Sequence, residues 1–140
     1  MTEQEQPDQT RSTARTTLLF PFVTSTGGYD TGVAISNASA EPFGSKPLAG
    51  ACRIHYFGRL VDGGPAPPVQ TSTVINPGSQ LNFTLFAGGM GIDGTPGFQG
   101  YLVVECFFYD AHGFAMVGDL GMQRVAAGYL AQVIPSPPQC

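Results

Sequence analysis

The sequence predicts an all-β fold, a two-sheet antiparallel sandwich of about eight short strands. Short apolar runs recur from Thr17 onward at spacings of about ten residues, and turn residues separate them. Glycine, with 19 residues, and proline, with 12, are frequent, which is typical of short strands joined by tight turns. No stretch shows the apolar period of a capped amphipathic helix, and residues 121–127 are expected to form one helical turn at most.

The chain of 140 residues is long enough for one domain with a full core. Residues 1–15 are polar and lack periodicity, and we expect them to form an N-terminal extension. Residues 16–134 make up the predicted β-sandwich domain, and residues 135–140 a proline-rich C-terminal tail.

The strands are expected where short apolar runs lie between turn signals. Pro21 lacks an N–H donor, so the first strand should be an edge strand or carry a bulge. The run at 100–109 is the most apolar and is the best candidate for a central strand. Segments 38–49, 58–68 and 88–97 are expected to be loops. The expected strands are 17–24, 31–37, 51–57, 69–75, 80–86, 100–109, 114–117 and 125–134.

Alternation along each run predicts which side chains face the core, because successive side chains of a strand point to opposite faces. The residues that share an inward face are Val33 and Ile35; Cys52, Ile54 and Tyr56; Val69, Thr71, Thr73 and Ile75; Leu81, Phe83 and Leu85; and Leu102, Val104, Cys106 and Phe108.

The chain has three cysteines, of which Cys52 and Cys106 fall within predicted strands and Cys140 is the last residue. An even pair with one left over fits an internal disulfide between Cys52 and Cys106 and a free or intermolecular thiol at Cys140. Both strand cysteines are predicted to face the core, as a bridge requires. Two buried free thiols are the alternative, because cysteine is among the most buried residue types.

Charge is unusually sparse, with six Lys or Arg and ten Asp or Glu residues and a net charge of −4. A basic stripe is absent, which argues against binding to nucleic acid. No run reaches the length of a membrane span. A solvated monomer usually carries more charge, so the surface is either a Ser/Thr-rich face of a secreted domain or is partly covered by neighbouring copies.

The first 15 residues lack the apolar core of a signal peptide. Three explanations remain open: a signal segment has been removed, the protein is intracellular, or it is exported in another way.

Several strings in the order LLFPFVT (18–24), YDTGVAISN (29–37), PFG (42–44), GFQGYLVVECFFYDAHGFAMV (97–117) and GYLA (128–131) cover most of the chain. In these strings the chain resembles an uncharacterised module of secreted and surface proteins of environmental bacteria. The resemblance implies a β-sandwich on an exported protein, with Cys52 and Cys106 at the two cysteine positions of the module. It implies no catalytic residues.

Two motifs have a functional and a structural interpretation. Residues 89–94 match the G-x-G-x-x-G spacing of dinucleotide sites, but a turn rather than a helix follows, which favours a hairpin loop. Asn37 and Asn82 begin N-x-[S/T] tripeptides, which also arise by chance in a Ser/Thr-rich chain.

The weak candidate polar site consists of His55, Asp110 and His112, since two histidines and a carboxylate can bind a metal ion. Their spacing does not favour a metal site over a turn in which Asp110 caps backbone donors. Tyr29, Tyr101, Tyr109 and Tyr129 are candidates for a glycan-binding face, although tyrosines of β-sandwiches more often pack across strands.

The sequence therefore favours a non-catalytic extracellular or cell-surface structural module, without a cofactor, that forms a homo-oligomer or a filament. In the filament, the N-terminal extension of one copy would add to a sheet edge of the next. The alternatives are an adhesion or carbohydrate-binding domain and, third, a small metal-dependent enzyme.

Overall fold

The computed structural model of the chain describes residues 14–40, 46–119 and 126–135. Within these ranges the protein is all-β, as predicted, and contains no α-helix. The expected number of strands is wrong, because the described residues form eleven strands and one short 3-10 helix. These elements are β1 (Thr16–Thr24), β2 (Tyr29–Asn37), η1 (Ala38–Ala40), β3 (Cys52–Leu60), β4 (Gln70–Thr71), β5 (Gln80–Thr84), β6 (Gly88–Gly89), β7 (Ile92–Asp93), β8 (Phe98–Cys106), β9 (Ala111–Asp119), β10 (Ala126–Leu130) and β11 (Gln132–Ile134).

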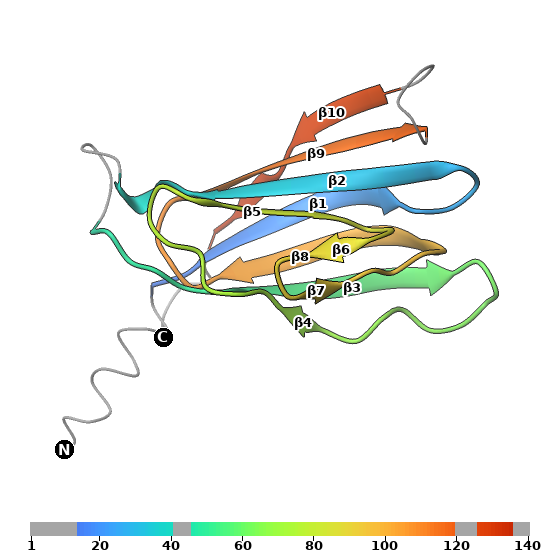
Figure 1. The fold of residues 1–140 in the computed structure, drawn as a ribbon, viewed down its shortest axis with the longest axis horizontal. Helices are drawn as coiled ribbons and strands as arrows, with labels where there is room; N and C mark the ends of the chain where they lie inside the picture. The colour runs from blue at the N-terminus through green and yellow to red at the C-terminus, as the bar shows by residue number, and fades with distance from the viewer. Residues whose placement is uncertain (1–13, 41–45, 120–125, 136–140) are drawn as a thin grey trace.

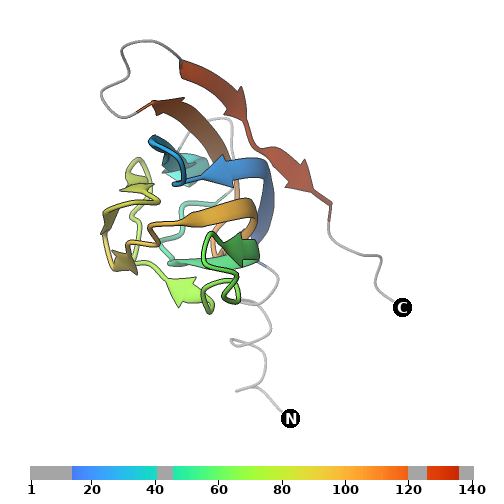
Figure 2. The same ribbon diagram turned by 90° about the vertical axis from the view of Figure 1, so that its right-hand side faces the viewer.

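The strands form two antiparallel sheets (Figure 1). The five-stranded sheet has the order β11-β1-β8-β3-β4, and the six-stranded sheet has the order β10-β9-β2-β5-β6-β7. The view along the strands in Figure 2 shows β10 and β11 following one another along the outside of the fold. β8 is paired on both sides, by β1 and β3, which confirms the most apolar run as a central strand.

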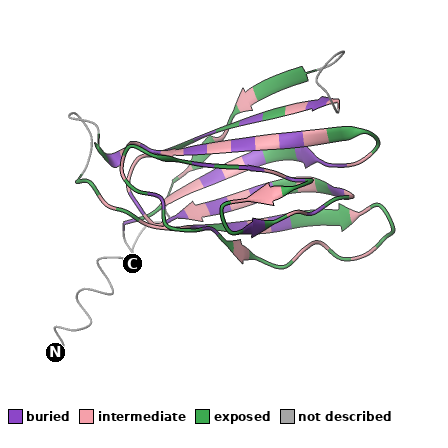
Figure 3. Ribbon diagram, viewed as in Figure 1, coloured by how far each residue is buried: buried purple, intermediate pink, exposed green. Residues whose placement is uncertain are grey.

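Buried and more exposed residues alternate along the long strands, as the colours of Figure 3 show. The inward sets predicted on β2, β3, β5 and β8 are confirmed, and residues of both sheets join in one hydrophobic core. Its largest fully buried side chains include Phe20, Phe98 and Phe108. This core fixes which residues reach the two outer faces.

A disulfide joins Cys52 of β3 to Cys106 of β8, two residues that lie directly opposite each other. The backbone N–H of Cys52 donates to Ser72 Oγ, and the Cys52 carbonyl accepts from the Ser72 N–H. Both backbone groups of Cys52 therefore point away from β8. The cysteines form a non-hydrogen-bonded pair, the position at which opposing side chains come closest.

Pro21 lies in a β-bulge rather than on an edge strand. β1 lies between β11 and β8, and its register with β8 shifts between Phe20 and Val23. The bulge frees the backbone groups of Phe22, and the Tyr129 hydroxyl both donates to the Phe22 carbonyl and accepts from its N–H. Tyr129 thus ties β10 to β1, which belongs to the other sheet.

The strand predicted at 69–75 is mostly wrong, since only Gln70 and Thr71 form β4. Beyond β4 the backbone finds other partners: the Thr73 N–H donates to the Met90 carbonyl, and Ile75 forms an isolated bridge with Gly50. Of the four residues predicted to face inward here, Ile75 is buried and the other three are not.

The two sheets are linked differently at the two edges of the fold. On one side, the Gln70 side chain accepts from the Asp93 N–H and donates to the Asp93 carbonyl, so a side-chain amide links the two-residue edge strands β4 and β7. On the other side, the strand predicted at 125–134 is two strands. β10 pairs with β9, and after Ala131 the chain continues as β11 beside β1.

Two residues of the predicted N-terminal extension, Ala14 and Arg15, are described and contact the domain. Ala14 is only 2% exposed, and Arg15 Nη1 lies 3.2 Å from Glu105 Oε2, so both residues belong to the domain. The rest of the extension, Cys140 and most of the predicted helical turn lie outside the described residues. Among the described residues no helix is long and apolar enough to cross a membrane.

Gly113 is expected to be intolerant of a side chain. A Cβ at this position of β9 would lie 2.7 Å from Cζ of the fully buried Phe20. We predict that Gly113→Ala lowers the free energy of unfolding by about 1–3 kcal/mol, because overpacked cores have to shift. The control is Gly32→Ala, where a Cβ meets nothing within 4 Å. Equal stability of the two variants by urea unfolding would contradict the packing described.

The disulfide is expected to contribute strongly to stability. It closes a loop with a sequence separation of 54, for which the chain-entropy model gives about 4 kcal/mol. Alkylation of the unfolded protein without reductant should leave Cys52 and Cys106 unmodified. Urea unfolding after reduction should shift to a markedly lower midpoint. Ready alkylation of both residues in the unreduced protein would show that the bridge is absent.

Candidate binding surface

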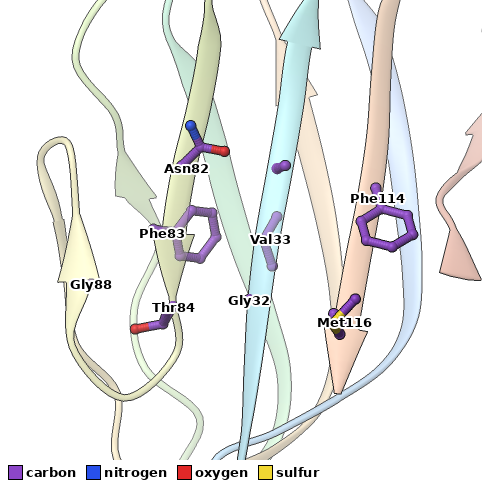
Figure 4. A pocket seen from close by; sticks show the side chains of 9 residues that line it. Gly32, Val33, Asn82, Phe83, Thr84, Gly88, Phe114 and Met116 are labelled. Carbon is purple, nitrogen blue, oxygen red and sulfur yellow. The ribbon is translucent and has the colours of Figure 1, made fainter. Parts of the chain in front are cut away.

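The outer face of the six-stranded sheet contains a trough (Figure 4). Its floor lies on β2, where the outward positions are held by the small residues Gly32 and Ala34. Thr84 and Asn82 of β5 form one wall, and Phe114 and Met116 of β9 form the other. The trough has a volume of about 510 Å³ and is open to solvent. It exists because two strands with larger outward side chains flank one with small ones.

The described lining of the trough is uncharged and mainly apolar. Phe114 is 39% exposed and Met116 is 37% exposed. The polar groups are the Asn82 side-chain amide and the Thr84 hydroxyl, which accepts from the Ala87 N–H. None of the described lining residues titrates near neutral pH, so they supply neither an acid nor a base. This chemistry suits contact with another uncharged surface.

The apolar surface continues from the trough onto β10. The ring of Phe114 lies over Gly128, where a Cβ would come within 2.6 Å of Phe114 Cζ. Leu130 lies directly opposite Phe114 in the β9–β10 pair and is 75% exposed. Together Leu130, Phe114 and Met116 form an exposed apolar patch at this edge of the sheet.

The outer face of the five-stranded sheet is different, because charged and aromatic groups share it. Phe57 and Tyr101 stack with ring centroids 5.0 Å apart and an interplanar angle of 16°. Both rings are exposed. They lie directly opposite each other on β3 and β8, a pairing that stabilises antiparallel strands.

Glu105 is the centre of the charged groups on that face. Its carboxylate lies 2.9 Å from His55 Nε2, 3.2 Å from Arg15 Nη1 and 3.7 Å from Arg53 Nη1. All four side chains are partly open to solvent, so each pair contributes at most about 1 kcal/mol. The cluster connects Arg15, which directly precedes β1, with β3 and β8, and its contacts are those of a surface network.

The candidate polar site of His55, Asp110 and His112 is not formed. His55 lies beside Glu105 on the five-stranded sheet, whereas His112 lies on an outward position of β9 in the other sheet. Asp110 and His112 line a shallow hollow together with Thr16 and Ile134, without His55. Among the described residues, no group of three or more His, Cys, Asp or Glu could hold a metal ion.

The glycine-rich segment at 89–94 forms a hairpin, as its turn residues predicted. β6 and β7 pair, and Met90 and Gly91 connect them with φ angles of 53° and 91°. Positive φ at both turn positions is the conformation that two-residue hairpins prefer. Met90 Sδ accepts from the Asn82 N–H at 3.3 Å and fixes the hairpin beside β5.

The two asparagine tripeptides have different environments. Asn37 is buried; its amide donates to the carbonyls of Leu48 and Ile75, and its side-chain oxygen accepts from Ser39. A glycan cannot be attached to this side chain in the folded domain. Asn82 is exposed at the wall of the trough.

The tyrosines proposed for a glycan-binding face do not share one face. Tyr101 lies on the five-stranded sheet, and Tyr29 begins β2 in the other sheet.

Two tyrosines have raised pKa values. Burial raises the pKa of Tyr129, and its hydrogen bond to the Phe22 backbone partly offsets this. Burial also raises the pKa of Tyr56 to about 12, a shift that the hydrogen bond from Gln70 reduces.

The sequence analysis singled out Asn82 of the trough only as the start of an N-x-[S/T] tripeptide, and it did not single out Phe114 or Met116. Phe114 and Met116 alternate with Ala111, Gly113 and Ala115, and this signal assigns them to an outward face.

Comparisons with protein-family models, with curated proteins and with solved structures find no match to this chain. Arguments about function therefore depend on the surfaces themselves.

Proposed function

We propose that this protein is a non-catalytic structural module, a two-sheet β-sandwich that assembles with copies of itself outside the cell. The observation that carries the proposal is the exposed, uncharged patch of Leu130, Phe114 and Met116 beside an open strand edge. Exposed apolar patches that adjoin an unprotected edge are typical of surfaces that another chain covers.

The unequal outer faces support this proposal. The five-stranded sheet carries the Glu105 cluster, which keeps its surface solvated. The described lining of the trough on the six-stranded sheet lacks charge. Removing water from an uncharged face costs less free energy than removing it from a charged one, because burying an unpaired charge is strongly unfavourable. The six-stranded sheet is therefore the face that we assign to self-association.

The disulfide supports the extracellular part of the proposal. Disulfides persist in secreted and surface proteins and are rare in reducing compartments. The Cys52–Cys106 bridge is fully buried and joins the start of β3 to the end of β8 in the five-stranded sheet. An extracellular or cell-surface location fits this bridge.

A filament would need a contact that does not close on itself. The N-terminal extension remains our proposed connector, in which residues 1–13 of one copy add to a sheet edge of the next. Ala14 is buried and Arg15 pairs with Glu105, so a deletion of residues 1–13 tests the connector without removing these two contacts.

Sedimentation equilibrium tests self-association. We expect the apparent mass to rise with concentration and to change little with added salt, because the patch is uncharged. Met116→Lys should weaken association by at least about tenfold, since a buried unpaired charge opposes contact by more than 1.4 kcal/mol. Val61→Lys is the matched control: it adds the same charge at a position that is 73% exposed and that directly follows β3 of the five-stranded sheet.

A protein that remains monomeric at every concentration would contradict the proposed function. If the deletion of residues 1–13 leaves long assemblies unchanged, the extension is not the connector, and self-association stands without it.

Carbohydrate binding is the second candidate, and the exposed Phe57–Tyr101 pair is the observation that favours it. Flat aromatic rings offer an apolar face to neutral ligands. In this case a glycan array should give specific binding that Tyr101→Ala abolishes. Tyr29→Ala, at a tyrosine of similar exposure, should retain it. Equal binding by both variants, or no binding by the wild type, would exclude this pair as a glycan site.

A further inference from the structure

β10 is an edge strand whose outer side has no partner among the described residues. The Ala131 N–H donates to the Gly113 carbonyl of β9. Backbone groups of successive residues point to opposite sides of a strand, so those of Ala127 and Tyr129 also face β9. The N–H and C=O groups of Ala126, Gly128 and Leu130 therefore point away from the sheet. They form a row of donors and acceptors that another strand can pair with.

Within the part of the chain that the structure describes, this edge lacks the features that usually block strand addition. Natural edges are short, charged, interrupted by proline or covered. β4 and β7 are two residues long, and the Gln70 side chain links them. β10 has five residues, continues into β11 after Ala131, and has neither a charge nor a proline in the sequence AAGYL. The unprotected edge thus lies beside the apolar patch.

We propose that β10 pairs antiparallel with β10 of a second copy, with Gly128 opposite Gly128 across a two-fold axis. The pairing rests on the self-association proposed above and specifies where it occurs. It joins the two six-stranded sheets into one continuous sheet. It also brings the apolar patches of both copies together on the same face.

The register follows from the backbone directions and from side-chain size. With Gly128 at the centre, Ala126 of each copy lies opposite Leu130 of the other. All three residues whose backbone groups point outward then form hydrogen-bonded pairs, each of which exchanges two N–H···O bonds. The largest outward side chain of β10 meets the small Ala126 rather than another leucine. Because Gly128 has no side chain, the Phe114 ring of each copy has room to lie over the glycine pair.

A second copy fits this edge better than the N-terminal extension does. Residues 1–13 contain Glu3, Glu5, Asp8 and Arg11, and Pro7 lacks a donor. Pairing such a segment here would place charges beside Leu130 and Phe114. β10 itself is uncharged and has the required alternation. A two-fold contact closes on itself, so it yields dimers that a separate connector would have to link into filaments.

Disulfide trapping with partners that each carry one free cysteine, besides the Cys52–Cys106 bridge, tests the register. Ala126→Cys and Leu130→Cys are made separately, each with Cys140→Ser, and the two proteins are mixed at low concentration, concentrated and mildly oxidised. Opposite residues in a hydrogen-bonded pair have Cα atoms about 5.5 Å apart, within the range that a disulfide spans. We expect a covalent heterodimer, identified by mass after digestion.

Each variant alone should not form this dimer, because identical residues in the two copies lie about 13 Å apart along the strands. A mixture of Leu130→Cys with Thr71→Cys, which lies on the opposite edge of the fold, is the matched control. Both substitutions in the main pair are at exposed positions, so the domain should fold.

Three outcomes would overturn the proposal, and they are distinguishable. Association of the wild type without the Ala126–Leu130 cross-link would place the contact elsewhere and leave the proposed function intact. Absence of any association in sedimentation would remove both. Cross-linking of Leu130→Cys to Thr10→Cys, in place of Ala126→Cys, would assign the edge to the N-terminal extension.

Discussion

The register between β3 and β8 is the constraint on which the rest of the fold depends. Because side chains alternate along a strand, a slip of one residue would turn every core side chain of β8 to the outside. The disulfide joins directly opposite residues and so allows one register only. β8 transmits this register to β1, where Leu18 lies opposite Val104 and Phe20 opposite Leu102.

The consequences of this register extend to the second sheet. Phe20 is directed to the inside of the fold, where its ring occupies the space that Gly113 of β9 leaves open. The alternating small residues of β9 therefore face inward, and Phe114 and Met116 face outward. The apolar patch is thus a consequence of core packing in the five-stranded sheet.

Much of this arrangement could be predicted from the sequence because it is local. A period of two in 51–57, 80–86 and 100–108 identifies the inward side chains of β3, β5 and β8. The same logic failed at 69–75, because Ser72 and Thr73 bond to Cys52 and Met90 instead of continuing a ladder. Local alternation cannot show which partner a backbone will find.

The surfaces could not be predicted for a related reason. Nothing in the composition of residues 125–134 marks a break between two strands. Only the structure shows that the chain passes from one sheet to the other at Ala131. The trough requires β2 to lie between β5 and β9, and these strands are far apart in the sequence. His55 and His112 are placed on different sheets by the same long-range pairing. Strand order therefore determines the functional surface, while alternation determines its side chains.

The positions of the few charged residues distinguish the two outer faces of the protein. Arg15, Arg53 and Glu105 cluster on the five-stranded sheet, whereas the described lining of the trough on the six-stranded sheet is uncharged. The charges of the six-stranded sheet, Asp30, Asp93 and Asp119, lie outside that lining. A surface of this kind favours contact with a surface like itself. β10 combines exposed apolar side chains with backbone groups that no described strand pairs with.

Residue-resolved amide hydrogen exchange tests the central claim, pairing of β10 across two copies, most directly. In dilute protein, the N–H groups of Gly128 and Leu130 should exchange quickly, whereas those of Ala127 and Tyr129 should be protected by β9. In concentrated protein, Gly128 and Leu130 should become protected as well, and the alternation should disappear. Persistent fast exchange at Gly128 and Leu130 in protein that has demonstrably associated would contradict the account.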